Sequence, residues 1–276
     1  MQSLAFGTLR KMKVTFSQPI NYYFRLGEQE IFLNDCLGKN IKLNFTGEIF
    51  CIQCNRKTSK SFQQGYCYPC MSRLYECGLC VIRPEKCKAH QDYCPENDWA
   101  HEQCLKPHIV YLANSSGLKV GITRESNLIN RWIDQGAKQG IPIMRVSNRY
   151  QSGLIELHLK QYVKDRTDWR KMLQKEIDSI DLQYFRNQLF NQAEEGLSRV
   201  TSQFSSEQIE FIKESDSISL SYPIIKYPEK IKTLSFDKTA EIDGRLEGIK
   251  GQYLIFDTGV INIRKFAGYQ VALNFN

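Results

Sequence analysis

Three features that would place a protein in a common class are missing from this 276-residue chain. The first residues, MQSLAFGTLRKMKV, contain no apolar stretch of the kind that forms a secretory signal. No apolar run approaches the roughly 18 residues that a membrane-spanning helix needs. Neither a Walker-type phosphate loop nor a dinucleotide-binding glycine motif is present. We therefore expect a cytoplasmic protein with reduced thiols, no membrane partner and no nucleotide cofactor.

Cysteine is almost confined to one block, because nine of the 10 cysteines lie between Cys51 and Cys104. Cys36 lies outside it, and we expect it to be a small buried apolar residue. The block opens with Cys51-x2-Cys54-x12-Cys67-x2-Cys70, which is the spacing of a zinc ribbon. Each CxxC pair can direct two thiolates at one ion, and Zn²⁺ prefers four such ligands in a tetrahedron. The spacing predicts a structural zinc ion held by these four residues.

Further potential ligands follow in the same block, enough for one or two more zinc ions. The nearest group of four, which we predict as a second zinc site, is Cys77, Cys80, Cys87 and His90. The remaining ligand types can instead complete that site or hold a third ion, and these residues are Cys94, His101, Cys104 and His108.

The charge of the chain is concentrated in its middle. Against 37 Lys and Arg stand 30 Asp and Glu, a net charge of +7. Twelve basic and five acidic residues lie between Lys106 and Lys171, so this segment carries the whole excess. Such a segment favours a nucleic-acid partner over a merely solvated basic face. The residues expected to contact phosphates are Lys119, Arg124, Arg131 and Arg149.

Hydrophobic patterning predicts an α+β protein. Alternating apolar residues near both ends indicate strands, and the two ends share an order of elements that indicates a weak internal repeat. A helical pattern runs from Trp169 to about Ser215. The expected parts are an N-terminal β-unit (1–48), a zinc-binding segment (49–107), a mixed α/β module (108–170), a helical segment (171–221) and a C-terminal β-unit (222–276) that packs with the first.

The mixed module carries a resemblance to a known superfamily. Two short apolar stretches surround an Asn-Ser-Ser-Gly turn, and two helix-like stretches follow. Ile109-Val110-Tyr111 and Lys119-Val120-Gly121, with Arg131 and Glu156 on the helices, resemble the GIY-YIG nuclease superfamily, particularly its phage-type branch. Over its whole length the chain also resembles an uncharacterised bacterial family, domain-of-unknown-function family 2797.

The GIY-YIG resemblance implies roles for four residues. Tyr111 would be the general base or its relay, Arg131 would bind the phosphate, and Glu156 would hold one Mg²⁺ or Mn²⁺. Lys119 stands where a second tyrosine is found in most of the superfamily. An ammonium can neutralise a phosphate, but it cannot relay a proton unless its pKa falls well below about 10.4.

Each of these residues also has an ordinary structural explanation. Tyr111 can be a packed aromatic residue, Arg131 can cover the indole of Trp132, and Glu156 can form a surface pair with Lys160. Three functions therefore remain open. They are a metal-dependent nuclease stabilised by zinc, a non-catalytic nucleic-acid-binding protein, and a zinc-stabilised scaffold for a protein partner.

Overall fold

The computed structural model describes residues 5–94, 97–163 and 168–275, so Lys164 and Arg166 of the basic segment lie outside the described residues. The chain forms two compact units. Unit 1 comprises Met1–Cys77, Arg170–Glu176 and Leu220–Asn276, and unit 2 comprises Gly78–Trp169 and Ile177–Ser219. Helices and antiparallel sheets occur together, which confirms the predicted α+β class. Of the helices in the described part, none has the length and apolarity to cross a membrane.

Unit 1 contains a 7-stranded antiparallel sheet and a smaller sheet of 3 strands. The large sheet has the order β1 (Ala5–Thr8), β15 (Tyr269–Phe275), β5 (Asn40–Phe50), β12 (Glu241–Lys250), β13 (Tyr253–Phe256) and β14 (Gly259–Asn262), with β6 (Lys57–Thr58) paired to β5. The small sheet consists of β2 (Lys13–Thr15), β3 (Asn21–Leu26) and β4 (Gln29–Phe32). The helical pieces are η1 (Asn34–Cys36), α1 (Tyr68–Arg73), η2 (Tyr75–Cys77), η7 (Ile263–Phe266) and most of α6 (Trp169–Gln174).

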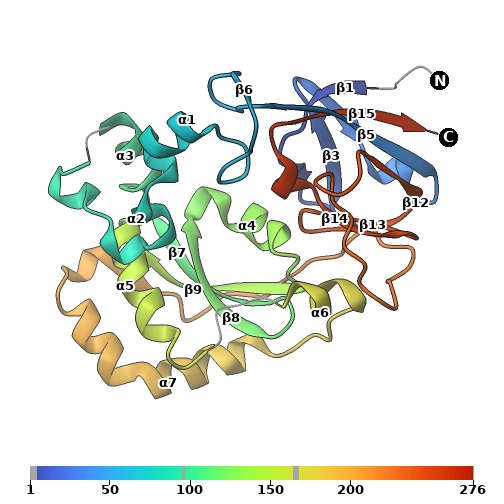
Figure 1. Cartoon of the computed structure of the whole chain (residues 1–276). Coiled ribbons are helices and arrows are strands. Elements are labelled where there is room, and N and C mark those ends of the chain that lie inside the picture. The colour runs from blue at the N-terminus through green and yellow to red at the C-terminus, as the bar shows by residue number, and fades with distance from the viewer. Residues whose placement is uncertain (1–4, 95–96, 164–167, 276) are drawn as a thin grey trace. The chain divides into compact units, whose positions relative to one another are not determined.

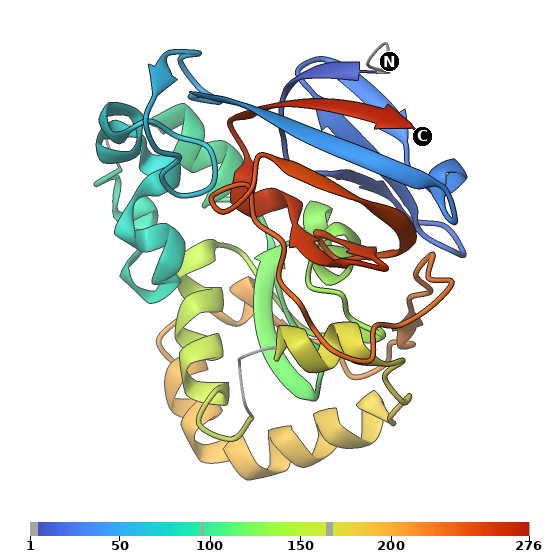
Figure 2. The same cartoon turned by 45° about the vertical axis from the view of Figure 1, so that its right-hand side comes forward.

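Strands from the two ends of the chain are neighbours in the large sheet (Figures 1 and 2). β15 lies between β1 and β5, and Leu273 pairs with Leu43. Ile41, Leu43 and Val271 are fully buried, which confirms the expected alternation with one buried face. The order β3-β4-η1-β5 is matched by β13-β14-η7-β15, so β4 corresponds to β14 and not to β13, with which the sequence repeat aligns it through Ile31 and Ile255. The core of unit 1 is therefore built by both ends of the chain.

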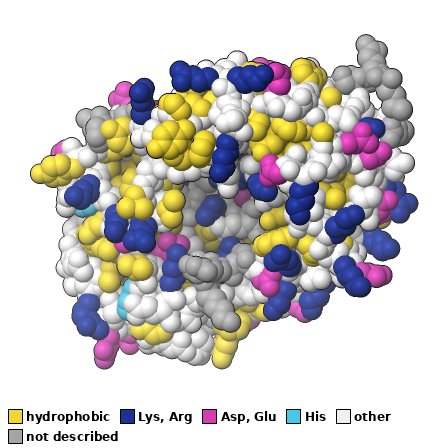
Figure 3. Space-filling model, in the orientation of Figure 1, with side chains coloured by type: hydrophobic (Ala, Val, Ile, Leu, Met, Phe, Trp, Pro, Cys, Tyr) yellow, Lys and Arg dark blue, Asp and Glu magenta, His cyan; other side chains and the backbone are white. Residues whose placement is uncertain are grey.

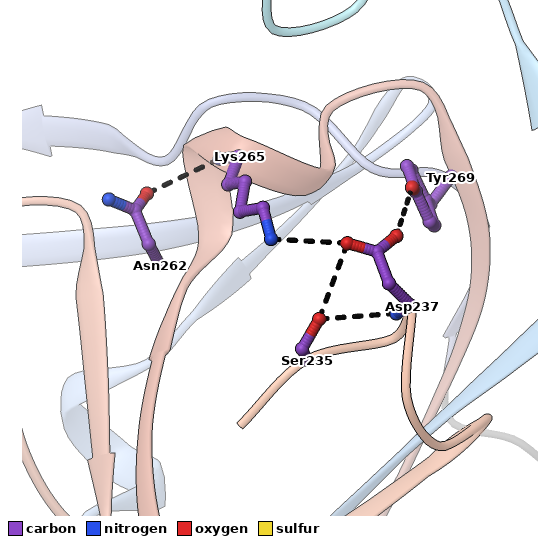
Figure 4. Close-up of polar contacts among 5 residues, drawn as sticks. All are labelled: Ser235, Asp237, Asn262, Lys265 and Tyr269. Carbon is purple, nitrogen blue, oxygen red and sulfur yellow. Dashed lines mark hydrogen bonds and ion pairs between the residues drawn. The ribbon is translucent and has the colours of Figure 1, made fainter. Parts of the chain in front are cut away.

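A polar cluster joins the loop before β12 to the last strand of unit 1 (Figure 4). Asp237 accepts hydrogen bonds from Tyr269 Oη at 2.7 Å and from Lys265 Nζ at 3.1 Å. The hydrogen bond from Tyr269, together with Lys265, holds the pKa of Asp237 below its usual value. Asn262 caps η7 by accepting from the Lys265 backbone N–H at 3.3 Å. These partners give Asp237 a structural role.

Unit 2 is built on an antiparallel sheet with the order β10-β9-β7-β8, with β11 also paired to β9. Its strands are β7 (His108–Asn114), β8 (Leu118–Arg124), β9 (Gln139–Val146), β10 (Ile209–Phe211) and β11 (Ile218–Ser219). Its helices are α2 (Leu79–Ile82), η3 (Pro84–Lys86), η4 (Ala89–Gln91), α3 (Asn97–Gln103), η5 (Glu125–Asn127), α4 (Leu128–Asp134), α5 (Arg149–Leu159), α7 (Leu182–Thr201) and η6 (Ser206–Gln208). β7 and β8 form the predicted hairpin.

Helices cover the two faces of this sheet differently (Figure 1). On one face, side chains such as Val110, Leu112 and Ile141 pack with α5 and α7 in one buried core. Trp132 of α4 packs on the other face, where a Cβ on Gly140 would lie 2.4 Å from its indole. The missing side chain of Gly140 thus allows α4 to approach the sheet closely. The face beneath α4 is the one that carries the candidate site.

The predicted helical segment is shorter than its pattern indicated. Asp181 caps α7 by accepting from the Tyr184 backbone N–H at 2.9 Å, and the helix ends at Thr201. Ile209, which was expected on a helix, instead lies in β10 and pairs with Val146 of β9. Pairing with an existing sheet edge decided the structure of this short segment, since local periodicity is weak over so few residues.

Candidate functional site

The first four cysteines of the block lie together, as their spacing predicted. One ligand atom from each of Cys51, Cys54, Cys67 and Cys70 lies within 4.8 Å of the others. The Sγ atoms of Cys54 and Cys67 are 3.8 Å apart. A tetrahedron with Zn–S bonds of about 2.3 Å has edges of about 3.8 Å, so this distance fits zinc. The four cysteines can therefore hold one zinc ion.

Two turns of the backbone form this group. Cys51 ends β5, and its N–H donates to Arg56 O at 2.9 Å, which folds the first CxxC pair into a turn. Burial opposes ionisation of Cys51, but hydrogen bonds from backbone N–H groups of Cys54, Cys67 and Gln53 lower its pKa to about 6. One thiolate is thus favoured near neutral pH, before any ion binds.

A second polar group lies beneath α4 in unit 2. Tyr111 of β7 is completely buried, and its hydroxyl donates to Gln135 Oε1 at 3.1 Å. The same hydroxyl accepts a hydrogen bond from Arg131 of α4. Burial raises the pKa of Tyr111 and outweighs the opposing effect of Arg131, so the phenol is neutral at physiological pH. The Trp132 ring packs edge-on against it at 5.9 Å.

Lys119 and Gly121 lie on the same face of the sheet as Tyr111. Gly121 is the register partner of Tyr111, and Lys119 is two residues earlier on β8. The Lys119 side chain is only 5% exposed, so its charge lies within this face of the sheet and not at the solvent-exposed surface. Within the described residues, Nε of Arg131 is buried and has no hydrogen-bond partner. The group thus contains a buried donor with unused capacity for an anion.

Glu156 lies on α5, a helix that packs against the other face of the sheet. Its carboxylate influences the Tyr111 phenol electrostatically, and its side chain is 12% exposed. Lys160 lies one helical turn later and approaches the carboxylate at 3.4 Å, which is the expected surface pair. His158 lies on another face of α5, where it packs beside Gly196 of α7. Tyr111, Arg131 and Glu156 are therefore related in space, whereas His158 is not part of this group.

The other residues expected to contact phosphate lie elsewhere on unit 2. Arg124 ends β8 and pairs in register with His108. Arg149 begins α5, and its Nη2 donates to Val81 O at 2.7 Å. On the face drawn in Figure 3, Lys and Arg side chains are dispersed among hydrophobic and uncharged ones. The basic side chains therefore form no continuous groove among the described residues on that face.

The four residues predicted to bind a second zinc ion do not all belong to the same unit. Cys77 is buried in unit 1, where Gln63 Nε2 donates to its carbonyl at 3.1 Å. Cys80 and Cys87 belong to unit 2. The His90 ring stacks on Tyr150 with 4.2 Å between centroids. Cys36, outside the block, is buried as expected.

Gln135 is the member of the Tyr111 group that the sequence did not indicate. It follows α4 and belongs to no motif, and its partnership with Tyr111 spans 24 residues. An amide in a helix-terminal position is usually solvated, so nothing in its local sequence distinguishes it. Only the pairing of β7 with its neighbours and the packing of α4 bring the two side chains together.

Comparison with known families gives one result. Residues 38–271 match DUF2797, a protein family of unknown function. The chain belongs to this family. No curated protein and no solved structure matches this DUF2797 member. The comparisons thus support the resemblance to family 2797 and give no support to the GIY-YIG resemblance.

Proposed function

We propose that this DUF2797 protein is a zinc-stabilised, divalent-metal-dependent nuclease of GIY-YIG-like type that acts at the Tyr111–Arg131–Glu156 group. The observation that carries the proposal is the half-buried Arg131 side chain, whose Nε atom is buried and has no hydrogen-bond partner within the described residues. Arg131 also donates to Tyr111, and the buried Lys119 lies on the same face of the sheet as Tyr111. Two cations beside one carboxylate suit a phosphodiester, which carries a negative charge and gains more in the transition state.

The Tyr111–Arg131–Glu156 group can bind one divalent ion, but it supplies few protein ligands. Glu156 offers a single carboxylate, and Lys160 lies 3.4 Å from it. Helical pairs of this kind contribute only about 0.2–0.5 kcal/mol, so an ion can displace Lys160 at small cost. Mg²⁺ commonly keeps several waters and uses substrate oxygens as further ligands. When bound, the ion would stabilise phosphoryl charge and lower the pKa of a coordinated water.

Hydrolysis forms a bond from water oxygen to phosphorus, breaks the bond to the leaving sugar oxygen, and returns a proton to that oxygen. Arg131 would hold the non-bridging oxygens, and Lys119 would neutralise the charge that develops on them. Tyr111, neutral and held by Gln135, would orient the attacking water by hydrogen bonding. Burial of Tyr111 and Lys119 strengthens the interactions of these two groups because the local dielectric is low.

The test is cleavage of labelled single- and double-stranded DNA and RNA by zinc-loaded protein with Mg²⁺ or Mn²⁺. Glu156→Gln should reduce cleavage about 100-fold or more with binding retained, a loss typical of removing one transition-state contact. Arg131→Ala should weaken both the cleavage and the binding of nucleic acid. Glu195→Gln and Arg199→Ala, on the exposed side of α7, are matched controls that should behave as the parent protein. No products from any substrate would reject the nuclease.

Two observations favour a second candidate, a non-catalytic nucleic-acid-binding protein. Tyr111 is fully buried with a raised pKa, and Lys119 stands where the superfamily has its second tyrosine. A neutral phenol and an ammonium are both poor bases at neutral pH. Retention of intact substrate that weakens with salt, as counterion release requires, would identify this function. Indifference to nucleic acid at low salt would instead favour the protein-partner scaffold.

A further inference from the structure

A second set of thiols lies together in unit 2. Cys87 and Cys104 are 3% and 1% exposed, and their thiols interact directly through a hydrogen bond. Cys80 and Cys94, both half-buried, pack against the same small cluster. None of the four forms a disulfide. Cys87 and Cys104 therefore meet directly, and Cys80 and Cys94 border the same core, although these thiols are not gathered within 4.8 Å of one another as those of the Cys51–Cys70 group are.

Each of these cysteines comes from a different short element. Cys80 lies in α2, Cys87 follows η3, Cys94 follows η4, and Cys104 follows α3. The fully buried members of the cluster are Cys87, Cys104 and two alanines, Ala89 and Ala100. These small side chains bury little apolar surface. Because each Å² of buried apolar surface contributes about 25 cal/mol, the hydrophobic effect alone stabilises the segment weakly. Small domains of this kind commonly need a metal ion or disulfides.

The first turns of α5 position this cluster. The Arg149 backbone N–H donates to Cys104 O at 2.8 Å, and its Nε donates to Cys80 O at 3.4 Å. One residue thus fixes the backbone at both ends of the cysteine set. Gly153 lies against the backbone between Cys80 and Cys87, where a Cβ would approach Glu85 N to 2.4 Å. The backbone of the cysteine segment is therefore held against α5 at several points.

We propose that Cys80, Cys87, Cys94 and Cys104 hold a second structural zinc ion in unit 2. Four thiols release four protons on binding Zn²⁺, and the resulting tetrathiolate site carries a charge of −2. The Arg149 guanidinium lies close enough to Cys80, Cys87 and Cys104 to interact with their charges, and it partly compensates that site. This set keeps Cys80 and Cys87 of the predicted site and replaces Cys77 and His90.

Zinc content of the purified full-length protein tests the proposal. The parent protein should contain two zinc ions per chain, and the double variants Cys51→Ser/Cys54→Ser and Cys87→Ser/Cys104→Ser should each contain one. Cys77→Ser and His90→Ala are the matched controls and should keep both ions. A single ion that disappears with Cys51 and Cys54 would overturn the proposal. Loss of the second ion in Cys77→Ser or His90→Ala would overturn the ligand set.

A measurement on the parent protein avoids variants that fail to fold. Alkylation followed by mass spectrometry should leave Cys80, Cys87, Cys94 and Cys104 unmodified until a chelator is added, and then label all four. Substitution of Co²⁺ should give the visible absorption of tetrahedral thiolate coordination in Cys51→Ser/Cys54→Ser. Labelling of Cys80 and Cys94 without chelator would overturn the proposal. An intact mass lower by two hydrogens, from a Cys87–Cys104 disulfide, would do the same. Neither outcome depends on nuclease activity.

Discussion

The phenol of Tyr111 occupies the space that a side chain at position 121 would need. A Cβ built on Gly121 would lie 2.5 Å from Tyr111 Oη and 2.6 Å from the ring carbon that bears it. The two residues are register partners on β7 and β8. Glycine at this position therefore sets where the hydroxyl of Tyr111 points, and with it the hydrogen bonds to Gln135 and Arg131.

Gly121→Ala should destabilise unit 2, because the added methyl group collides with a fully buried ring. Overpacking of this kind costs about 1–3 kcal/mol of unfolding free energy. Chemical denaturation followed by tryptophan fluorescence will report the change, since Trp132 packs on Tyr111. An unchanged midpoint would show that the phenol does not lie against Gly121.

His108 should make stability depend on pH below about 6.5. It is fully buried, and burial lowers its pKa from 6.5 to about 4. The unfolded chain then binds more protons between these values, so stability is lost as pH falls through that range, by at most about 3 kcal/mol. His108→Asn keeps a donor for Lys106 O and should flatten this part of the curve. The two proteins, both zinc-loaded, are compared by urea denaturation from about pH 7 to about pH 4. An unfolding free energy that falls with pH by the same amount in both proteins would contradict the prediction.

Tyr269→Phe should loosen the loop that carries Asp237. The lost hydrogen bond, 2.7 Å long, is expected to contribute about 1 kcal/mol, since half of the Asp237 side chain is exposed to solvent. Because the folded pKa of Asp237 is depressed, its contribution exists above about pH 4 and is lost as pH falls further. The difference in melting temperature between variant and parent should therefore shrink in acid. A carboxyl pKa of Asp237 that does not rise in the variant would be inconsistent with this contact.

Cys54→Ser should release the first zinc ion and open the turn between the two CxxC pairs. Cys54 is the exposed ligand, so the substitution disturbs little packing apart from the metal site. Without the ion, trypsin should cleave rapidly at Arg56, Lys57 or Lys60, which lie inside the ligand loop. Cys36→Ser, remote from the ligands in sequence, is the control and should keep its zinc. Equal digestion of the Cys54 variant and the parent would argue against a structural ion.

Some of the site could be predicted from the residues alone. The Cys51–Cys70 spacing predicted four thiols in one place because two turns of fixed length dictate that geometry. The β7–β8 hairpin followed from two apolar stretches around a short turn. The ligands of a second zinc ion stay a prediction, since several cysteines and histidines lie at similar separations and spacing alone does not choose among them.

The sequence by itself determined the local patterns: a zinc-ribbon spacing, alternating strands at both ends, and a basic middle segment. Tertiary structure alone decided that Gln135 meets Tyr111, that Ile209 joins a sheet edge, and that Cys104 meets Cys87. The reason is physical. Spacing along the chain fixes contacts only within a turn or a hairpin, whereas contacts between distant residues follow from strand order and helix packing, which the whole chain decides together.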